Sequence, residues 1–405
     1  MTRKEEPAFD TSKVQNMLKN VTSLEDLTGP NGVMQEMFKS TIERILKAEQ
    51  EAHLGYPPHS ETGKNTGNNR NGYSSKKLKT SHGTVDIDVP RDRNGEFDPK
   101  ILKKNQTFDP VLEKQILGMY ARGVTTRDIQ TQLKEVYGTD ISPSYVSKVT
   151  DHILDGVYEW QQRPLETTYA VVFLDAIHFK IRHEGKVNSR ASYTCMGIDL
   201  EGNIDVLGMW ISENEGAHFW QTVLNDLKER GVKDILIACV DGLKGFPEAI
   251  EAIFPKTQVQ LCVVHQIRTA LRYTGSKYHK ELIKDMKLIY NASTLENAEK
   301  SLENFEEKWS KNATAAVASW KNNWACLSTF FDFPQEIRKI IYTTNAVESL
   351  HRQFRKVTKA KGSFPTDESV KKMLYLAVKG LKVKKKNNWA TMLGQLKNYF
   401  GDRVY

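Results

Sequence analysis

The fold is decided by two apolar stretches of the sequence, YAVVFLDAIHFKI at residues 169–181 and DILIACVDG at residues 234–242. β-Branched and aromatic residues dominate the first stretch and β-branched residues the second, and this composition favours strands. The chain between and after them continues with expected strands at 191–200, 204–211 and 258–264 and expected helices at 217–230, 246–254 and 265–273. Three adjacent strands followed by alternating helices and strands predict an α/β fold with a mixed sheet and helices packed against it.

Acidic residues stand at three positions where the apolar pattern makes them unusual. Asp175 interrupts the first stretch, and Asp241 ends the strand of the second. Glu348 lies beside the apolar stripe of a helical region expected at 335–359. A carboxylate in an apolar strand is costly unless it is paired or binds a cation, and ligands bind at the carboxyl ends of strands in α/β sheets. If the two strands are neighbours, we expect the three acids to converge.

Converging carboxylates provide the hard oxygen ligands that bind Mg²⁺ or Mn²⁺. Two such ions about 3.5–4 Å apart activate a water or a 3′-hydroxyl and stabilise the leaving oxygen of a phosphodiester. We therefore expect Asp175, Asp241 and Glu348 to form a catalytic site with two metal ions. Taken singly, Asp241 followed by Gly242 also fits an ordinary turn, and Glu348 also fits a solvated helix position.

Cys262 and His265 form a Cys-x-x-His pair near the end of the last expected strand. A structural zinc site needs a second pair at suitable spacing, which Cys239 and Cys326 do not provide. We therefore expect Cys262 to be packed and His265 to lie at a strand end. From there His265 reaches the acidic cluster, where it positions a phosphate or the attacking group, so it is a fourth candidate catalytic residue.

The part of the chain before the expected sheet reads as mainly helical. A helix at 33–54 precedes a hairpin with strands at 73–80 and 84–89, and three short helices follow at 111–121, 125–136 and 142–153. A tight turn at 137–141 predicts a helix-turn-helix. Its third helix would present four residues to DNA, namely Ser144, Tyr145, Ser147 and Lys148. A plain three-helix bundle is the alternative.

Positive charge is concentrated in one C-terminal segment. The 405 residues carry 58 Lys and Arg against 50 Asp and Glu, a net charge of +8. Residues 351–386 contain 12 of the basic residues and two acids, a net charge of +10, so the rest of the chain carries −2. This distribution indicates a polyanionic partner. The expected phosphate contacts, which begin on the helix of Glu348, are Arg352, Arg355, Lys356, Lys359 and Lys361.

Several classes of protein are disfavoured by the sequence. No apolar run approaches the roughly 18 residues that span a bilayer, and the first residues lack the apolar segment of a secretory signal. Four scattered cysteines fit reduced thiols better than a disulfide framework. We expect a soluble, cytoplasmic protein with no membrane partner. Residues 277–323 read as an inserted helical module, whose tryptophans we expect to fill its core rather than stack on bases.

Ordered motifs along most of the chain identify a resemblance. They are GY at 72–73, KTSHG at 79–83, PRDRNG at 90–95, YARG at 120–123, DA at 175–176, VDGLKGF at 240–246, CVVH at 262–265 and YTTNAVESL at 342–350. With these motifs the chain resembles the mutator-type transposases of bacterial insertion sequences, which have a ribonuclease-H-like Asp-Asp-Glu catalytic domain. The resemblance implies that Asp175, Asp241 and Glu348 are the catalytic triad and that Cys262 and His265 are a family signature near the site.

These expectations define seven segments of the chain. They are a mobile lead-in (1–30), a helix and β-hairpin that bind DNA ends (31–108), a helix-turn-helix-like domain (109–160), the first part of a ribonuclease-H-like catalytic domain (166–274), a helical insertion (275–335), the Glu-bearing helix with the basic segment (336–386) and a C-terminal tail (387–405).

The expected function is that of a bacterial, nucleoid-associated DNA transposase. It would bind the terminal inverted repeats of its element, free a 3′-hydroxyl with water and join that hydroxyl to target DNA. Its partners would be double-stranded DNA and a second copy of the chain, with no small-molecule substrate. The alternatives are a structure-selective nuclease on the same fold and a non-catalytic DNA-binding regulator derived from a transposase.

Overall fold

The computed structural model describes most of the chain. The described residues are 11–29, 31–60, 67–80, 83–104, 106–138, 140–183, 185–212, 217–243, 245–342, 345–381 and 384–404. They fall into two compact units, residues 1–152 and 153–405. Within the described ranges, no helix combines the length and the apolar content needed to cross a bilayer.

The first unit contains helices and a two-stranded sheet. Its elements are α1 (Thr11–Lys19), α2 (Leu24–Thr28), α3 (Val33–Leu54), β1 (Arg70–Thr80), β2 (Gly83–Asp92), α4 (Pro110–Ala121), α5 (Thr126–Tyr137) and α6 (Pro143–Asp151). β1 and β2 pair antiparallel from Arg70↔Asp92 to Thr80↔Gly83, and residues 81 and 82 of the expected hairpin turn lie outside the described residues. Leu46 of α3 packs with Leu78 and Ile87 to form the core of this sheet.

The segment 1–30, expected as a mobile lead-in, contains two helices in its described part. Ser23 and Asp26 form a capping box at the start of α2, which satisfies backbone donors that would otherwise be unpaired. Val14 of α1 is buried. The third helix of the expected helix-turn-helix also ends earlier than expected, because α6 stops at Asp151 and a new helix begins at Ile153 in the second unit.

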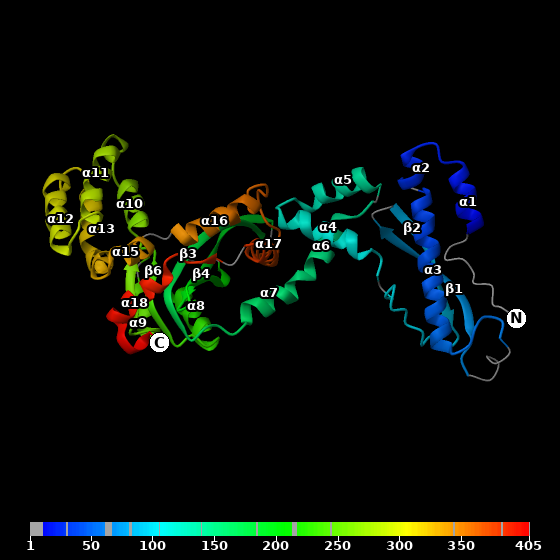
Figure 1. Cartoon of the computed structure of the whole chain (residues 1–405). Coiled ribbons are helices and arrows are strands. Elements are labelled where there is room, and N and C mark those ends of the chain that lie inside the picture. The colour runs from blue at the N-terminus through cyan, green and yellow to red at the C-terminus, as the bar shows by residue number, and fades with distance from the viewer. Residues whose placement is uncertain are drawn as a thin grey trace. The chain divides into compact units, whose positions relative to one another are not determined.

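The second unit is a mixed α/β structure (Figure 1). Its strands are β3 (Thr168–His183), β4 (Lys186–Asp199), β5 (Asn203–Ser212), β6 (Asp234–Val240), β7 (Gln258–Leu261) and β8 (Lys384–Lys385). They form one sheet in the order β7-β6-β3-β4-β5-β8. The pairs β3–β4, β4–β5 and β5–β8 are antiparallel, whereas β6 and β7 continue the sheet parallel to β3. The expected mixed α/β class is therefore confirmed.

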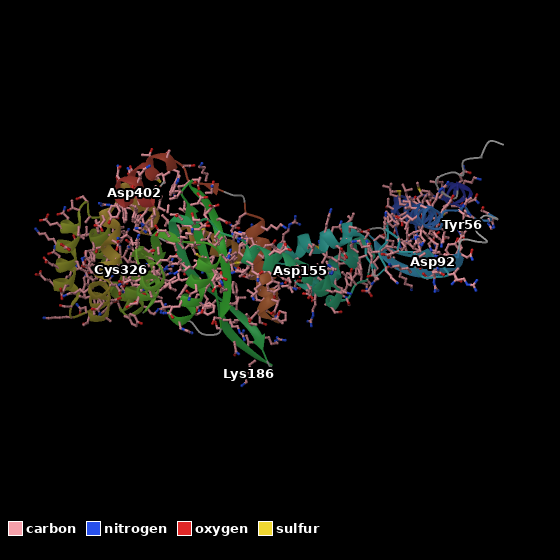
Figure 2. The ribbon with its side chains drawn as sticks, turned by 90° about the horizontal axis from the view of Figure 1, so that it is seen from below. Tyr56, Asp92, Asp155, Lys186, Cys326 and Asp402 are labelled. Carbon is pink, nitrogen blue, oxygen red and sulfur yellow. The ribbon has the colours of Figure 1, made fainter. Side chains whose placement is uncertain are left out.

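Helices cover the sheet and extend beyond it. They are α7 (Ile153–Gln162), α8 (Ala217–Glu229), α9 (Phe246–Ile253), α10 (Val263–Arg272), α11 (His279–Tyr290), α12 (Leu295–Trp309), α13 (Thr314–Asn322), α14 (Trp324–Leu327), α15 (Gln335–Ile341), α16 (Asn345–Thr358), α17 (Asp367–Lys379) and α18 (Trp389–Phe400). Short 3-10 helices lie at Ser276–Tyr278, Ser328–Asp332 and Gly401–Arg403. Figure 2 shows Lys186 at the tip of the long β3–β4 pair.

The helical module between α10 and α15 has a packed interior. Trp309 and Trp320 are buried there with Phe305, as expected for core residues. The indole nitrogen of Trp309 donates a hydrogen bond to Asp285 at 2.8 Å, so its one polar atom is satisfied. Trp324 is half-buried and packs against the same core.

The C-terminal residues 387–405, expected as a tail, form a packed helix instead. α18 buries four apolar residues at helical spacing, which are Trp389, Met392, Leu396 and Phe400. Gly202, in the β4–β5 turn, has a φ of 85°, and a Cβ atom there would lie 2.4 Å from the Trp389 ring. The turn therefore needs glycine both for its left-handed backbone and for the close approach of α18.

Candidate active site

Asp175 lies in β3, the strand paired on one side with β4 and on the other with β6. Its neighbour Ala176 pairs with Tyr193, whose ring contacts Trp220 of α8 at 4.8 Å. Because successive side chains of a strand alternate between faces, Asp175 points to the face opposite α8. There Nδ1 of His351, on α16, lies 3.5 Å from its Oδ2. The backbone N–H of Ala176 donates to Oδ1 at 2.8 Å.

Asp241 lies beside Asp175 because of the parallel register of their strands. β6 pairs with β3 up to Leu174↔Val240, and Asp241 is the next residue of the chain. The side chain of Asp175 is only 6% exposed, whereas Asp241 is half-buried. The strand order therefore places two carboxylates side by side, as the sequence predicted if these strands were neighbours.

Glu348 reaches the same region from a helix. Glu348 lies in the first turn of α16, and Val347 and Phe354 of the same helix are buried in the interior. The helical region expected at 335–359 consists of two helices, because α15 ends at Ile341 and α16 begins at Asn345; residues 343 and 344 lie outside the described residues. Glu348 forms an ion pair with Arg268 of α10, in which its Oε1 lies 2.6 Å from Nη1 of the arginine.

The sequence suggested that His265 lies at a strand end, but the structure places it in the first turn of α10. β7 ends at Leu261 because β6, its only partner in the described sheet, ends at Val240. The N–H of Cys262 still donates to the carbonyl of Val240 at 2.8 Å, and the helix begins one residue later. Cys262 is buried, as expected.

The pKa values of Asp175 and His265 are both raised, which favours the neutral form of the aspartate and the charged form of the histidine. Burial raises the pKa of Asp175 to about 6; the positive His265 opposes this rise, and the carboxylates of Asp241 and Glu348 add to it. A hydrogen bond with Cys262 raises the pKa of His265 to about 9, and both aspartates also favour its charged form. All three acids and His265 are therefore electrostatically coupled around Asp175.

His351 behaves differently from His265. Burial, together with the charges of Arg355 and His265, lowers its pKa to about 3. Its imidazole is therefore neutral at physiological pH, and Asp175 has in it a polar but uncharged neighbour.

The donor set suits a divalent cation. Carboxylate oxygens are the preferred ligands of Mg²⁺, and a dication would relieve the repulsion that raises the pKa of Asp175. In the described part of the chain, the three carboxylates do not all lie within 4.8 Å of one another. Glu348 is turned to Arg268 instead, so joining a shared site requires Glu348 to exchange this ion pair for a cation.

Four of the five expected phosphate contacts after Glu348 are exposed. These four are Arg352, Arg355, Lys356 and Lys359. Lys361 is different, because its ammonium lies 5.4 Å from the centre of the Phe364 ring and burial, with Lys372 nearby, lowers its pKa to about 8. Lys361 is therefore partly engaged in packing.

The four expected DNA contacts of the first unit also differ from one another. Ser147 and Lys148 are exposed on α6. The Ser144 hydroxyl lies 2.8 Å from that of Ser142, the N-cap of the helix. The Tyr145 ring stacks on Phe108 with a centroid distance of 3.4 Å. One face of this ring is thus covered by protein.

A cavity of about 1140 Å³ lies beside α6 in the first unit. Tyr145 and Lys148 line it from the helix, and Lys100, Lys103 and Lys104 line it from the preceding loop. Glu96, Asp98 and Glu113 also line it and offset much of this positive charge. The cavity extends the surface that Lys148 offers to an anionic partner.

A second cluster of possible metal ligands occurs in the first unit. His53, Asp92 and Glu96 place one ligand atom each within 4.8 Å of one another, and Figure 2 shows Asp92 in this unit. However, Asp92 already accepts hydrogen bonds from Asn68 at 2.7 Å and from the N–H groups of Glu96 and Phe97. The cluster is explained by the turn that Asp92 holds in place.

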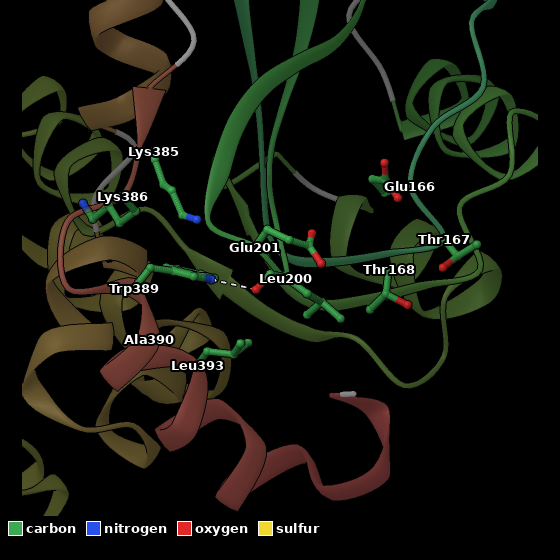
Figure 3. Close-up of a pocket in the computed structure, with 10 residues that line it drawn as sticks. All are labelled: Glu166, Thr167, Thr168, Leu200, Glu201, Lys385, Lys386, Trp389, Ala390 and Leu393. Atoms are coloured by element: carbon green, nitrogen blue, oxygen red, sulfur yellow. Dashed lines mark hydrogen bonds between the residues drawn. The ribbon is translucent and has the colours of Figure 1, made fainter.

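A cavity of about 540 Å³ in the second unit is lined by residues other than Asp175, Asp241 and Glu348. Figure 3 shows its lining side chains. Trp389 lines it and donates a hydrogen bond to the carbonyl of Leu200 at 2.8 Å. Thr168 also lines it, and seven residues of strand separate Thr168 from Asp175, a distance of about 23 Å. Glu201 and Lys385 give it mixed charge, and none of the sequence-predicted site residues lines it.

Sequence reasoning missed two residues at the candidate site, His351 and Arg268. Each lies three residues after a predicted site residue on the same helix, His351 after Glu348 and Arg268 after His265. Residues at this spacing share a helix face, so the spacing could have identified them as neighbours of the site.

The fold and the site together define a mixed α/β protein with an acidic cluster at a junction of sheet and helices. The chain belongs to the Mutator family of transposases, whose profile matches residues 10–391. Its resemblance to mutator-type transposases is thereby confirmed.

Curated relatives cover almost the whole chain. It is 43% identical over 384 residues to a probable transposase for insertion sequence element ISRM3-like from Sinorhizobium fredii, covering 94% of this chain and 95% of the relative. Identity and coverage are the same for the transposase for insertion sequence element ISRM3 from Rhizobium meliloti. The transposase for insertion sequence element IS905 from Lactococcus lactis is 33% identical, over 88% of this chain and 92% of the relative.

A solved structure of a simian T-cell lymphotropic virus intasome in complex with a PP2A regulatory subunit matches with 9% identity over 47% of this chain and 63% of that one. Its TM-score of 0.18 is too low to support a conclusion about fold or function.

Proposed function

We propose that this chain is a DNA transposase that binds the terminal inverted repeats of its insertion sequence and cleaves and joins DNA strands with Asp175, Asp241 and Glu348. One observation carries the proposal. The carboxylates of Asp241 and Glu348, from two other elements, both act on the buried carboxyl of Asp175. Membership in the Mutator family supports a role in DNA processing.

The three acids would hold Mg²⁺ or Mn²⁺, two ions per site. When bound, such ions favour the nucleophilic form of a water or 3′-hydroxyl and stabilise the leaving oxygen of a phosphodiester. Asp175 and Asp241 provide a rigid pair of ligands from neighbouring strands, and Glu348 completes the set from α16. His265, with a pKa of about 9, stays protonated and orients the negative phosphate beside the acids.

The sheet supports a ribonuclease-H-like assignment of the catalytic domain. Three antiparallel strands are extended by two strands parallel to β3, with helices packed on the sheet. The helical module of α11–α13 lies in sequence between Asp241 and Glu348, where the family resemblance implies an insertion.

DNA binding is assigned to exposed cations in each unit. α5 and α6 are in contact and suit a helix-turn-helix, with Ser147 and Lys148 exposed. The exposed Arg and Lys side chains of α16 would bind phosphates next to the acids. Joining two element ends needs two sets of acids, so a homodimer is the smallest active assembly.

The direct experiment replaces Asp241 with alanine in the full-length protein. Cleavage of a labelled element end in Mg²⁺ should fall about a thousandfold or more, because metal-assisted charge stabilisation is worth several kcal/mol. Binding of the same end in EDTA should be unchanged. Glu251→Gln, which alters an exposed acid of α9, is the matched control and should cleave normally. An Asp241→Ala protein that cuts and joins at the normal rate would refute the assignment.

Pre-cut ends distinguish the transposase from the alternatives. A transposase joins such ends to target DNA, whereas a structure-selective nuclease only hydrolyses DNA. A non-catalytic regulator would bind the element ends but would not cleave DNA in Mg²⁺ or in Mn²⁺.

A further inference from the structure

His351 is the buried neighbour of Asp175 that the proposed chemistry does not yet use. It lies one turn after Glu348 on α16, and only 2% of its surface is exposed. Its Nδ1 is 3.5 Å from Oδ2 of Asp175. A polar ring buried this deeply is costly unless its nitrogen atoms interact with polar groups. Asp175 supplies such a group for Nδ1, whereas Nε2 is buried with no hydrogen-bond partner among the described residues.

The contact fixes the orientation of the Asp175 carboxyl. Oδ1 faces the N–H of Ala176 at 2.8 Å, and Oδ2 faces His351. The two oxygens are thus held by groups on different sides, one from the strand itself and one from α16.

The contact also links two acids that are far apart in the sequence. His351 and Glu348 share one face of α16, so a fixed distance from His351 to Asp175 fixes the position of Glu348 over β3. Beside His351 on α16, Glu348 forms an ion pair with Arg268, and Val347 and Phe354 are fully buried and nonpolar. Nonpolar packing tolerates small sliding movements of a helix, whereas the polar contact between Nδ1 and Oδ2 is kept only over a narrower range of positions.

We propose that His351 is a positioning residue that orients the Asp175 carboxylate and sets the spacing between Asp175 and Glu348 for cation binding. The proposal rests on the proposed function of these acids. It predicts that the imidazole acts through Nδ1 alone. An asparagine at this position also carries a nitrogen bonded to Cγ, so its amide should take the place of Nδ1. A leucine fills a similar volume but has no hydrogen-bond donor.

The test measures Mn²⁺ binding to the full-length protein by electron paramagnetic resonance, without DNA and without turnover. His351→Leu should weaken Mn²⁺ binding ten- to a hundredfold, a loss typical of groups that orient metal ligands. His351→Asn should stay within about threefold of the wild type. Leu350→Ala, which removes a buried side chain of the same helix, is the control and should lower the unfolding temperature while leaving Mn²⁺ binding unchanged.

A double-mutant cycle tests whether His351 works through Asp175. In an Asp175→Asn background, His351→Leu should cause no further loss of Mn²⁺ affinity. If the leucine variant does not fold, His351→Gln moves the amide nitrogen one bond further out and should show the same loss. End cleavage should show a lower kcat with an unchanged KM for DNA.

Two results would overturn this inference alone. One is wild-type Mn²⁺ affinity in a folded His351→Leu protein, and the other is an Asn variant as impaired as the Leu variant, which would show a role for ring packing. A wild-type protein that binds no Mn²⁺, or an Asp175→Asn protein that binds it normally, would overturn the proposed function of the acids, and the inference with it.

Discussion

Helices α16 and α6 both carry residues expected to contact DNA, but they are built differently. α16 buries His351 beside Asp175, and its polar inner side is held by specific contacts. α6 buries only Val146, Val149 and Thr150, and its Lys148 projects from the surface. The difference follows from what each helix must do, because reacting groups need fixed positions whereas phosphate contacts need only accessible positive charge.

The largest effect is expected from the inner side of α16. Glu348→Gln keeps the size of the side chain and removes its charge, so cleavage of a labelled end should fall about a thousandfold. End binding measured by gel shift in EDTA should remain within about twofold of the wild type, since Glu348 is not a cationic contact. A parallel loss of binding and cleavage would mean that this side of the helix is not specialised for chemistry.

The exposed side of α16 should show the reverse behaviour. Replacing Arg352, Arg355 and Lys359 together with glutamine should weaken DNA binding about tenfold or more at 0.15 M salt. The slope of log affinity against log salt should fall by about 2.5, because three phosphate contacts are lost. Lys361→Gln is the control and should have a smaller effect, since Lys361 packs on Phe364. An unchanged slope would remove this side of α16 from the DNA interface.

The buried acid also predicts a dependence of stability on pH. The pKa of Asp175 is about 6 in the folded protein against 3.8 for an exposed aspartate, so the folded state binds its proton more tightly than the unfolded state. Ionisation of Asp175 therefore lowers the free energy of unfolding as the pH rises from about 4 to 7.

Asp175→Asn should consequently be more stable than the wild type in EDTA. The gain should be about 1–3 kcal/mol at pH 7.5 and should disappear below about pH 4. Urea unfolding at several pH values measures it. A variant that is less stable than the wild type at pH 7.5 would show that burial of the ionised Asp175 does not destabilise the fold. The buried side of α16 would then not differ in this respect from the exposed residues of α6.

The smallest effect is expected on α6. Lys148→Gln should weaken end binding about threefold and lower the salt slope by about 1, in keeping with one phosphate contact. Cleavage at saturating protein should be unchanged. Tyr145→Phe is the matched control, because the ring stacks on Phe108 and its hydroxyl contacts protein side chains, Glu113 at 3.4 Å and Thr107. A stronger effect of Tyr145→Phe than of Lys148→Gln would reverse this assignment.

Local patterns in the sequence predicted most of the sheet and its acids. The strand at 234–240 and the helix at 33–54 have the predicted boundaries, because β-branched runs and helical spacing are properties of adjacent residues. Asp175 and Asp241 were expected to be neighbours only if β3 and β6 pair, and the register Leu174↔Val240 confirms that condition.

The features that were not predicted depend on tertiary contacts. The end of β7 at Leu261 follows from the length of its partner β6, and the ion pair between Arg268 and Glu348 joins helices 80 residues apart. The helix at Trp389–Phe400 could have been recognised from its apolar spacing, but only its packing against Gly202 explains why it is ordered.

The central claim is that residues around 175, 241 and 348 share one cation site. Replacing Mg²⁺ with Fe²⁺ in the presence of ascorbate and peroxide generates hydroxyl radicals that cut the backbone next to the bound ion. The fragments should map near all three positions, and excess Mg²⁺ or Asp241→Ala should suppress them. Cuts confined to the neighbourhood of His53, Asp92 and Glu96, or found at only one of the three acids, would contradict the account.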